Sequence, residues 1–166
     1  MKEKYSKRDF INLAILSAAY VIIILILIIP GKVYGSQLDW ENQHWVLPEY
    51  FRNRFYETGQ LFPSFASEIG GGQNIYYFAY YGLYSPFLLL SYLLPFIEMR
   101  TYIIAVNIIA VFAGIWLFYR WIRMKYDAKV TFFVTLLFLM AAPVILHSHR
   151  HVMFVDYIPF LLMLFI

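Results

Sequence analysis

The chain has 166 residues, of which 62% are hydrophobic, 21% aromatic and only 14% charged, whereas a soluble domain has about 25% charged residues. This composition excludes an ordinary water-soluble fold, and it excludes intrinsic disorder because disordered segments are poor in apolar side chains. The absence of cysteine excludes disulfides, iron–sulfur clusters and thiol nucleophiles, and the small, scattered net charge of +3 argues against nucleic-acid binding. Four stretches without a charged residue instead predict an all-α integral membrane protein, a polytopic helical bundle: residues 10–31, 69–97, 101–119 and 130–146.

The first predicted transmembrane helix covers residues 10–29, of which only three are polar. Twenty helical residues at about 1.5 Å each match a hydrocarbon core of about 30 Å. Residues 1–9 form a tail with four basic and two acidic side chains, so the positive-inside rule predicts a cytoplasmic N-terminus. The alternative is a signal peptide cleaved near Gly35. Since signal-peptide apolar cores are usually about 7–15 residues long, the length of this run favours a retained anchor.

Residues 30–100 are predicted to form one large external loop. The first regular element predicted in this loop is an amphipathic helix. Within residues 45–58, Leu47, Phe51 and Phe55 recur at a spacing of four, which is typical of a helix that lies in the membrane interface. Three consecutive glycines and a tyrosine-rich stretch follow. Tyrosine at this density suits the headgroup layer, because the ring is buried there while the hydroxyl stays hydrated.

A second membrane-surface helix is predicted for residues 83–97, an apolar segment of only fifteen residues between prolines. If this segment crossed the membrane, six Lys and Arg residues of the chain would lie inside and seven outside. If it lies on or dips into the outer leaflet, eight lie inside and five outside. The charge distribution and the short length therefore agree that the segment does not span.

The remainder of the chain predicts two complete membrane spans and the start of another. Residues 101–119 and 130–146 form helices two and three, joined by a basic cytoplasmic loop at residues 120–129. Residues 147–151 form an external turn, and residues 152–166 begin a fourth helix that is still apolar at the last residue. We therefore expect the chain to be the N-terminal part of a longer protein.

Two aspartates at the predicted outer surface are the main candidates for chemistry. Asp39 follows the first span and could act as a general base or as a ligand of a divalent metal ion, the one cofactor considered. On composition alone, a solvated loop acid or a helix cap is the simpler interpretation. Asp156 lies five residues into an apolar run, where a carboxylate is costly unless it is paired, and Arg150 is one possible partner.

The densest polar cluster is the sequence His147-Ser-His149-Arg150-His151. Alternate histidines share a face only in an extended chain, so metal binding is the weaker interpretation. A phosphate site is favoured, in which Arg150 binds with its planar guanidinium and His147 and His149 donate hydrogen bonds. The alternative is a loop of interfacial polar residues that only connects two helices.

The order of these parts resembles a known family. The motifs that carry the resemblance are Gly35-Ser-Gln-Leu-Asp39-Trp-Glu-Asn-Gln43, Gly70-Gly-Gly-Gln-Asn74 and the segment from Tyr80-Tyr-Gly-Leu-Tyr-Ser-Pro to Pro95. Over nearly its whole length the chain is similar to the N-terminal part of the YfhO-type bacterial membrane proteins, which belong to the GT-C glycosyltransferase superfamily.

The resemblance implies a GT-C-like bundle in the bacterial cytoplasmic membrane, whose external loop carries two membrane-surface helices. It implies transfer of a sugar from a polyprenyl-phosphate donor to a cell-envelope glycopolymer on the outer face. By the same resemblance Asp39 is the catalytic base and Asp156 a second acid. Trp40 and Gln43 beside Asp39, and Asn74 after the glycines, are predicted to bind substrate. The Trp40 ring could stack on a sugar face, but an interfacial tryptophan explains it equally well.

The competing hypothesis is a transporter or flippase for a lipid-linked glycan, or a non-catalytic subunit that handles one. Transporters usually carry ionisable groups in the middle of the membrane, along the path of the substrate. The spans at residues 101–119 and 130–146 have none, which favours an enzyme that acts at the outer face.

Overall fold

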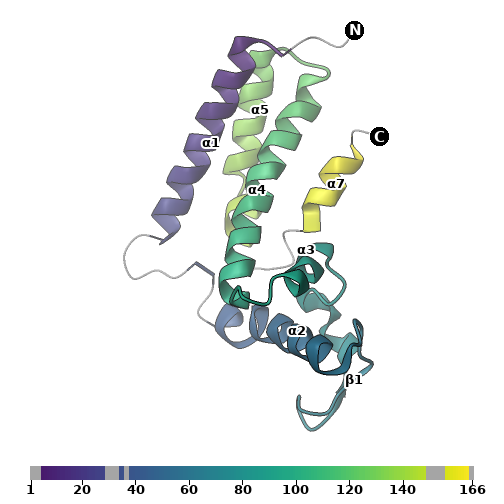
Figure 1. The fold of residues 1–166 in the computed structure, drawn as a ribbon. Helices are drawn as coiled ribbons and strands as arrows, with labels where there is room; N and C mark the ends of the chain where they lie inside the picture. Colours follow the sequence, from purple (N-terminus) through teal and green to yellow (C-terminus); the bar gives the residue numbers. More distant parts are fainter. Residues whose placement is uncertain (1–4, 29–33, 36–37, 149–155, 165–166) are drawn as a thin grey trace.

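The computed structural model describes residues 5–28, 34–35, 38–148 and 156–164, and most of these residues are helical (Figure 1). Three helices form a bundle: α1 (Lys7–Ile28), α4 (Met99–Arg123) and α5 (Ala128–Met140). A short helix, α7 (Tyr157–Met163), lies beside α4. Both α1 and α4 are long and apolar enough to cross a membrane, whereas α5 is shorter.

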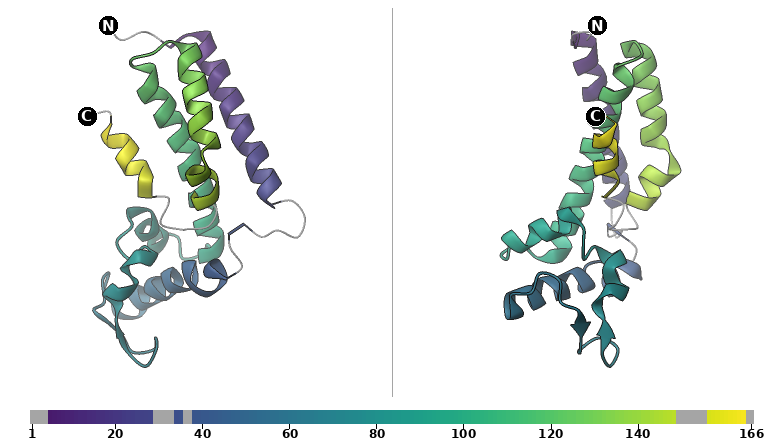
Figure 2. Two further views of the ribbon diagram at one scale, coloured as in Figure 1. Left: turned by 180° about the vertical axis from the view of Figure 1, so that it is seen from behind. Right: turned by 90° about the vertical axis from the view of Figure 1, so that its right-hand side faces the viewer.

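The residues between α1 and α4 fold into a layer across one end of the bundle (Figures 1 and 2), and we call residues 38–98 the loop layer. Its elements are η1 (Trp40–His44, one π-helical turn), α2 (Val46–Thr58), the antiparallel strands β1 (Phe65–Ala66) and β2 (Gln73–Asn74), the 3-10 helix η2 (Ile75–Tyr81), α3 (Pro86–Leu89) and the 3-10 helix η3 (Leu90–Leu93). Phe51, Ile75 and Leu83 are completely buried and give the layer its own core.

The bundle combines an apolar core with an apolar outer surface. Leu16, Ile115 and Leu139, one from each helix, are completely buried in a single cluster. In contrast, Phe10 and Ile26 of α1 are 63% and 60% exposed. Because apolar surface left in water costs about 25 cal/mol per Å², a helix with such a surface is typical of one that faces lipid or another apolar partner.

A buried carboxylate holds α1 against α4 at the end of the bundle opposite the loop layer. Asp9 is completely buried. Its Oδ1 accepts hydrogen bonds from Arg123 Nε at 2.8 Å and from the Tyr119 hydroxyl at 2.9 Å, and its Oδ2 accepts from the amide and hydroxyl of Ser6, both at 2.8 Å. Each oxygen of the Asp9 carboxylate therefore accepts two hydrogen bonds, which compensate for its burial.

Asn12, one turn further along α1, extends this network to α5. Its Nδ2 donates to the Tyr119 hydroxyl at 3.1 Å and to the carbonyl of Ala128 at 2.8 Å. We refer to the residues Ser6, Asp9, Asn12, Tyr119 and Arg123 as the Asp9 network. Composition alone counted Asp9 as a charge of the tail at residues 1–9, but the structure begins α1 at Lys7 and buries this carboxylate between helices.

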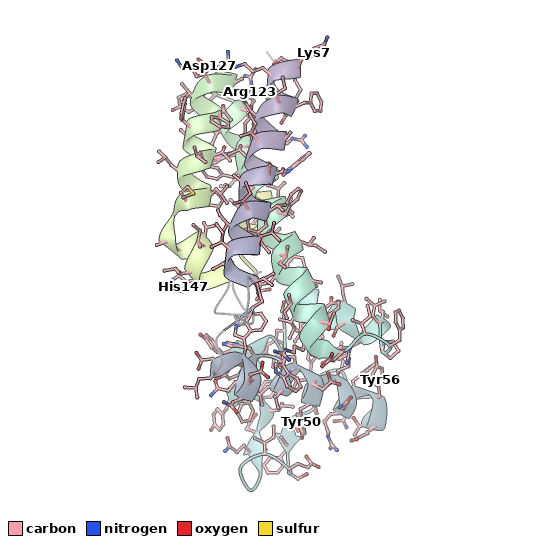
Figure 3. The ribbon with its side chains drawn as sticks, turned by 90° about the vertical axis from the view of Figure 1, so that its left-hand side faces the viewer. Lys7, Tyr50, Tyr56, Arg123, Asp127 and His147 are labelled. Atoms are coloured by element: carbon pink, nitrogen blue, oxygen red, sulfur yellow. The ribbon has the colours of Figure 1, made fainter. Side chains whose placement is uncertain are left out.

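The network fixes the direction of the chain. Lys7, Arg123 and Asp127 lie at one end of the bundle, whereas His147 lies toward the end that carries the loop layer (Figure 3). The helices α1 and α4 therefore run in opposite directions, and the chain between them starts and finishes at the same end. Residues 83–97 accordingly lie in the loop layer and do not run along the bundle (Figures 1 and 2).

The prediction of a single helix at residues 83–97 is wrong in detail. The structure has two four-residue helices, α3 and η3, followed by turns up to the start of α4. Leu94 leaves the helical region, with φ −126° and ψ 58°. The physical reason is Pro95, whose ring disfavours a helical conformation in the residue before it. The helix expected at residues 45–58 is present as α2, with its start at Val46.

The last two expected spans also differ at their ends. The helix expected at residues 101–119 is longer in both directions, as α4, so that the loop expected at 120–129 is reduced to residues 124–127. Asp127 caps α5, because its Oδ1 accepts from the amides of Lys129 and Val130 at 2.8 and 2.9 Å. The helix expected at 130–146 stops at Met140, since Pro143 cannot continue the hydrogen-bond ladder; one π-helical turn, η4 (Pro143–His147), follows.

Two expected elements are described only in part. In the turn expected at residues 147–151, His147 and Ser148 are described, and the others lie outside the described residues. In the helix expected at 152–166, the structure describes Asp156 and the seven residues of α7.

We predict that Asp9→Asn strongly destabilises the protein, because it leaves the Arg123 guanidinium, which is 13% exposed, without its counter-charge. Removing one partner of a buried ion pair costs about 3–5 kcal/mol. Thermal unfolding of the purified protein in detergent should show a clear drop in Tm, and the Asp9→Asn/Arg123→Met double variant should recover part of it. Lys125→Met, which removes an exposed cation at the same end, is the control and should leave Tm unchanged. An Asp9→Asn protein as stable as the unmodified chain would contradict the proposed role of the network.

Candidate functional site

The candidate site lies where the start of the loop layer meets the first turns of α4. Trp40 and His44 are both only 2% exposed, because the π-helical turn η1 directs them inward, whereas Asp39 and Glu41 are partly exposed. Their backbone is one turn of an uncommon helix type, which is frequent at functional sites. The turn thus separates two packing residues from two carboxylates that reach solvent.

Asp39 is the residue at the N-terminal end of η1, and its side chain makes no capping hydrogen bond there. Gln43, four residues later in η1, contacts Tyr81 of η2. Burial is the main cause that raises the pKa of Tyr81, and the interactions with Tyr80 and Asp39 raise it further.

Tyr81 also fixes the other side of η1. Its hydroxyl donates to Gln43 Oε1 at 2.5 Å, and its ring lies 5.6 Å from the imidazole of His44. Gln43, expected to bind substrate, is therefore held next to Asp39 by a tyrosine that the sequence analysis did not single out. The tyrosine-rich stretch was interpreted as a whole, and no local pattern distinguishes Tyr81 from its neighbours.

Trp40 does not provide the exposed ring that the sequence analysis expected for a sugar. It packs edge-on against Tyr34, with ring centroids 5.6 Å apart, in a cluster with Met99 and Ile103. A Cβ atom on Gly35, whose φ is +99°, would lie 2.5 Å from the Trp40 ring. The glycine that begins the first motif is therefore needed so that this ring can be buried, and Trp40 is a packing residue in this structure.

Asn74 likewise has a structural contact in place of the expected binding role. Its Oδ1 accepts a hydrogen bond from the amide of Tyr76 at 3.0 Å and so caps the first turn of η2. Asn74 also belongs to β2, in the hairpin at the far end of the loop layer from the bundle (Figure 1).

Asp156, the second candidate acid, precedes α7 and lies outside both long apolar helices. It is half-buried, and its Oδ1 accepts a hydrogen bond from the Ser85 hydroxyl at 2.6 Å. A half-buried carboxylate that keeps a hydrogen-bond donor is suited to accept a proton in catalysis.

A single turn of the loop layer connects the two acids. Tyr81 binds Gln43, which follows Asp39 by four residues in η1, and Ser85, four residues after Tyr81, binds Asp156. Four extended residues span at most about 14 Å, and here the chain is folded back by a hydrogen bond from the Ser85 amide to the Gly82 carbonyl at 2.9 Å. The residues 81–85, which we call the acid-linking turn, therefore bring both candidate acids to the same region.

Arg100 is a further candidate that the sequence analysis counted only as a charge. Its Nη2 donates to Glu41 Oε1 at 2.6 Å, and the two side chains are 34% and 39% exposed. The contact joins the first turn of α4 to η1 across 59 residues of sequence, which is why no local motif indicated it. A partly exposed guanidinium held by Glu41, two residues after Asp39, is suited to bind a phosphate group, since its planar fork can hold two phosphate oxygens.

The histidine cluster can be assessed only at its first member. His147 is exposed at the end of η4. The neighbouring Ser148 lies near the site, because its carbonyl accepts a hydrogen bond from the Tyr34 hydroxyl at 3.2 Å, and the Tyr34 ring contacts Trp40. His149 and Arg150, the other residues expected to bind phosphate, lie outside the described residues.

Within residues 5–28, 34–35, 38–148 and 156–164, no group of three or more His, Asp or Glu side chains is arranged to hold a metal ion. Glu41, two residues after Asp39, forms an ion pair with Arg100.

Comparison of the chain with protein-family models, with curated proteins and with solved structures gave no match. The similarity to YfhO-type proteins therefore stays a prediction from the motifs of this sequence.

Proposed function

We propose that this chain is a multi-pass protein of the bacterial cytoplasmic membrane, with a cytoplasmic N-terminus and the loop layer on the outer face. Two features support this arrangement. The helices α1 and α4 could each cross a bilayer. In addition, Lys7 and Arg123 lie at the end of the bundle away from the loop layer (Figure 3), as the positive-inside rule requires of the cytoplasmic side.

We further propose that the protein transfers a sugar from a polyprenyl-phosphate donor to a cell-envelope glycopolymer. The observation that carries this proposal is that the acid-linking turn contacts both Gln43, in the same turn as Asp39, and Asp156, while Arg100 is paired with Glu41 of η1. A glycosyl transfer needs a carboxylate near the reacting carbon and a cation near the leaving phosphate. Asp39, Asp156 and Arg100 lie at the end of the bundle where a lipid-linked donor would be accessible from the outer leaflet.

In the proposed reaction the acceptor hydroxyl attacks the anomeric carbon of the donor sugar. The bond from that carbon to the phosphate oxygen breaks, and its electron pair leaves with the lipid phosphate, so that no acid is needed to expel it. Asp39 accepts the proton of the attacking hydroxyl and stabilises the positive charge that develops on the sugar ring. Arg100 binds the departing phosphate. A single displacement of this kind inverts the anomeric centre.

Translocation of a lipid-linked glycan is the second candidate function, and one observation favours it. Asn107 in the middle of α4 is completely buried, and neither polar atom of its amide has a hydrogen-bond partner. Polar groups in the middle of a span often line a substrate path. Against this, the charged residues of α1 and α4 are confined to their end turns, which favours chemistry at the surface.

The topology predicts which side of the membrane each surface faces, and the lack of cysteine makes a clean test possible. Leu38 and Tyr126 are 74% and 53% exposed and lie at opposite ends of the bundle. In intact cells, an impermeant maleimide should label the Leu38→Cys variant and leave the Tyr126→Cys variant unlabelled until the membrane is opened. Labelling of position 126 in intact cells would overturn the proposed orientation.

We expect Asp39→Asn to preserve folding but to lower sugar transfer by about 100-fold or more, the contribution typical of a general base. The measurement is consumption of a polyprenyl-phosphate-linked sugar by the full-length protein in liposomes, with lipid translocation followed in parallel. Glu57→Gln, which neutralises a 62% exposed acid of the loop layer, is the matched control and should remain active.

Two results would argue against this function. Unchanged transfer by Asp39→Asn would exclude Asp39 as the base. If the unmodified protein moves the lipid-linked sugar across the membrane without consuming it, and Asp39→Asn abolishes this movement, the transporter is favoured.

A further inference from the structure

A group of aromatic side chains is exposed on the loop layer and takes no part in the proposed catalytic site. The rings of Tyr76 and Tyr84 are nearly parallel, with an angle of 14° and centroids 6.0 Å apart, and Phe62 lies 5.2 Å from Tyr84. The three side chains are 47%, 47% and 40% exposed, respectively. They come from three separate segments of sequence, so that folding has to assemble them. We call Phe62, Tyr76 and Tyr84 the aromatic platform.

The backbone under two of these rings is held in place. The amide of Tyr76 donates to Asn74 Oδ1 at 3.0 Å, and the amide of the preceding Ile75 donates to the Ser64 carbonyl at 3.1 Å. Tyr84 lies within the turn closed by the Ser85 amide and the Gly82 carbonyl, where Gly82 has φ +97°. A platform with a fixed backbone loses little conformational entropy when a ligand binds.

The platform is continuous with a carboxylate. Ser85, the residue after Tyr84, donates its hydroxyl to Asp156 Oδ1 at 2.6 Å, and Asp156 is half-buried. Aromatic faces bind the apolar C–H face of a pyranose ring, while tyrosine hydroxyls and carboxylates accept or donate hydrogen bonds to its hydroxyl groups. Three exposed rings, the central one next in sequence to the residue that binds an acid, therefore match the chemistry of a glycan chain.

We propose that the aromatic platform binds a glycan, with pyranose rings stacked on Phe62, Tyr84 and Tyr76, of which Tyr84 is the central ring. This inference rests on the proposed function in one respect: the bound glycan is the acceptor polymer of the transfer reaction. The platform then determines which class of acceptor reaches the acids, because the acid-linking turn carries both its central ring and the residue that holds Asp156.

The alternative occupant of exposed tyrosines is the bilayer surface, and the position of the platform favours the glycan. Tyr76 directly follows β2, which pairs with β1, and β1 lies at the end of the loop layer far from the bundle (Figures 1 and 2). The exposed side chains Leu93 and Phe96, which lack a polar tip, belong to the segment just before α4. These are the side chains that lipid would select.

Binding is tested with cellohexaose, a neutral hexasaccharide of pyranose rings, and the full-length protein in lipid nanodiscs, by saturation-transfer NMR titration. We expect measurable binding by the unmodified protein. Tyr84→Ala and Tyr76→Leu should each weaken it by about fivefold or more, as loss of one aromatic contact requires. Tyr84→Phe, which keeps the ring, should stay within about twofold of the unmodified protein. Tyr126→Ala, which removes a 53% exposed tyrosine at the other end of the bundle, should bind normally.

The outcomes separate this inference from the proposed function and from membrane contact. No binding by the unmodified protein, or equal binding by Tyr84→Ala and Tyr76→Leu, overturns the platform even if sugar transfer is observed. Binding that depends on the rings in a protein that never transfers sugar supports the platform and removes only the transferase proposal. A nitroxide at Tyr77→Cys, a position 77% exposed beside Tyr76, should be relaxed by a water-soluble nickel chelate in liposomes. If oxygen relaxes this nitroxide more strongly than the nickel chelate does, the platform lies in lipid and the proposal is overturned.

Discussion

The arrangement of the whole chain depends on how one buried carboxylate is satisfied. Asp9 is completely enclosed, and the groups that neutralise it come from the far end of α4. A buried charge without such partners would cost several kcal/mol, so α1 and α4 are stable side by side only in this register. Because that register places the start of α1 next to the end of α4, the intervening chain has to return to the opposite end. The loop layer, and with it every candidate site residue described above, follows from this constraint.

Hydropathy and charge were sufficient to locate the main helices. The apolar runs gave α1 and α4 to within a few residues, and the spacing of Leu47, Phe51 and Phe55 gave α2, because these signals are local and the periodicity of a helix is read directly from them. The segment at 83–97 was misjudged because its apolar content suggested continuity, whereas Pro95 prevents a helical conformation at Leu94.

The site was harder to predict for a different reason. Gln43 and Asp156 were identified by residue type, but their partners Tyr81 and Ser85 were not, and neither was the pair of Arg100 with Glu41. Each of these contacts joins positions between 38 and 71 residues apart. Trp40 shows the opposite error. Its aromatic ring suggested ligand binding, but a fold that places Gly35 against it uses the same ring for packing.

The polar side chains at the two ends of the bundle differ in their exposure to solvent. In the Asp9 network the completely buried carboxylate accepts four hydrogen bonds, so these groups contribute to stability and are poorly placed to take up a ligand. At the other end, Asp39, Glu41 and Arg100 are partly exposed, and Arg100 is paired with Glu41. Such partly exposed side chains can exchange a protein partner for a substrate at low cost, which is what a reaction at a membrane surface requires.

The long sequence separation within the Asp9 network has a consequence for biosynthesis. The carboxylate and the guanidinium that neutralises it are 114 residues apart. At a translation rate of about 5–20 residues per second, about 6–23 s pass between the synthesis of the carboxylate and that of its counter-charge. Under the proposed topology, the carboxylate has to stay in water at the membrane edge during that interval. The proposed topology therefore has the final depth of the first helix set only when the C-terminal turn of α4 has been made.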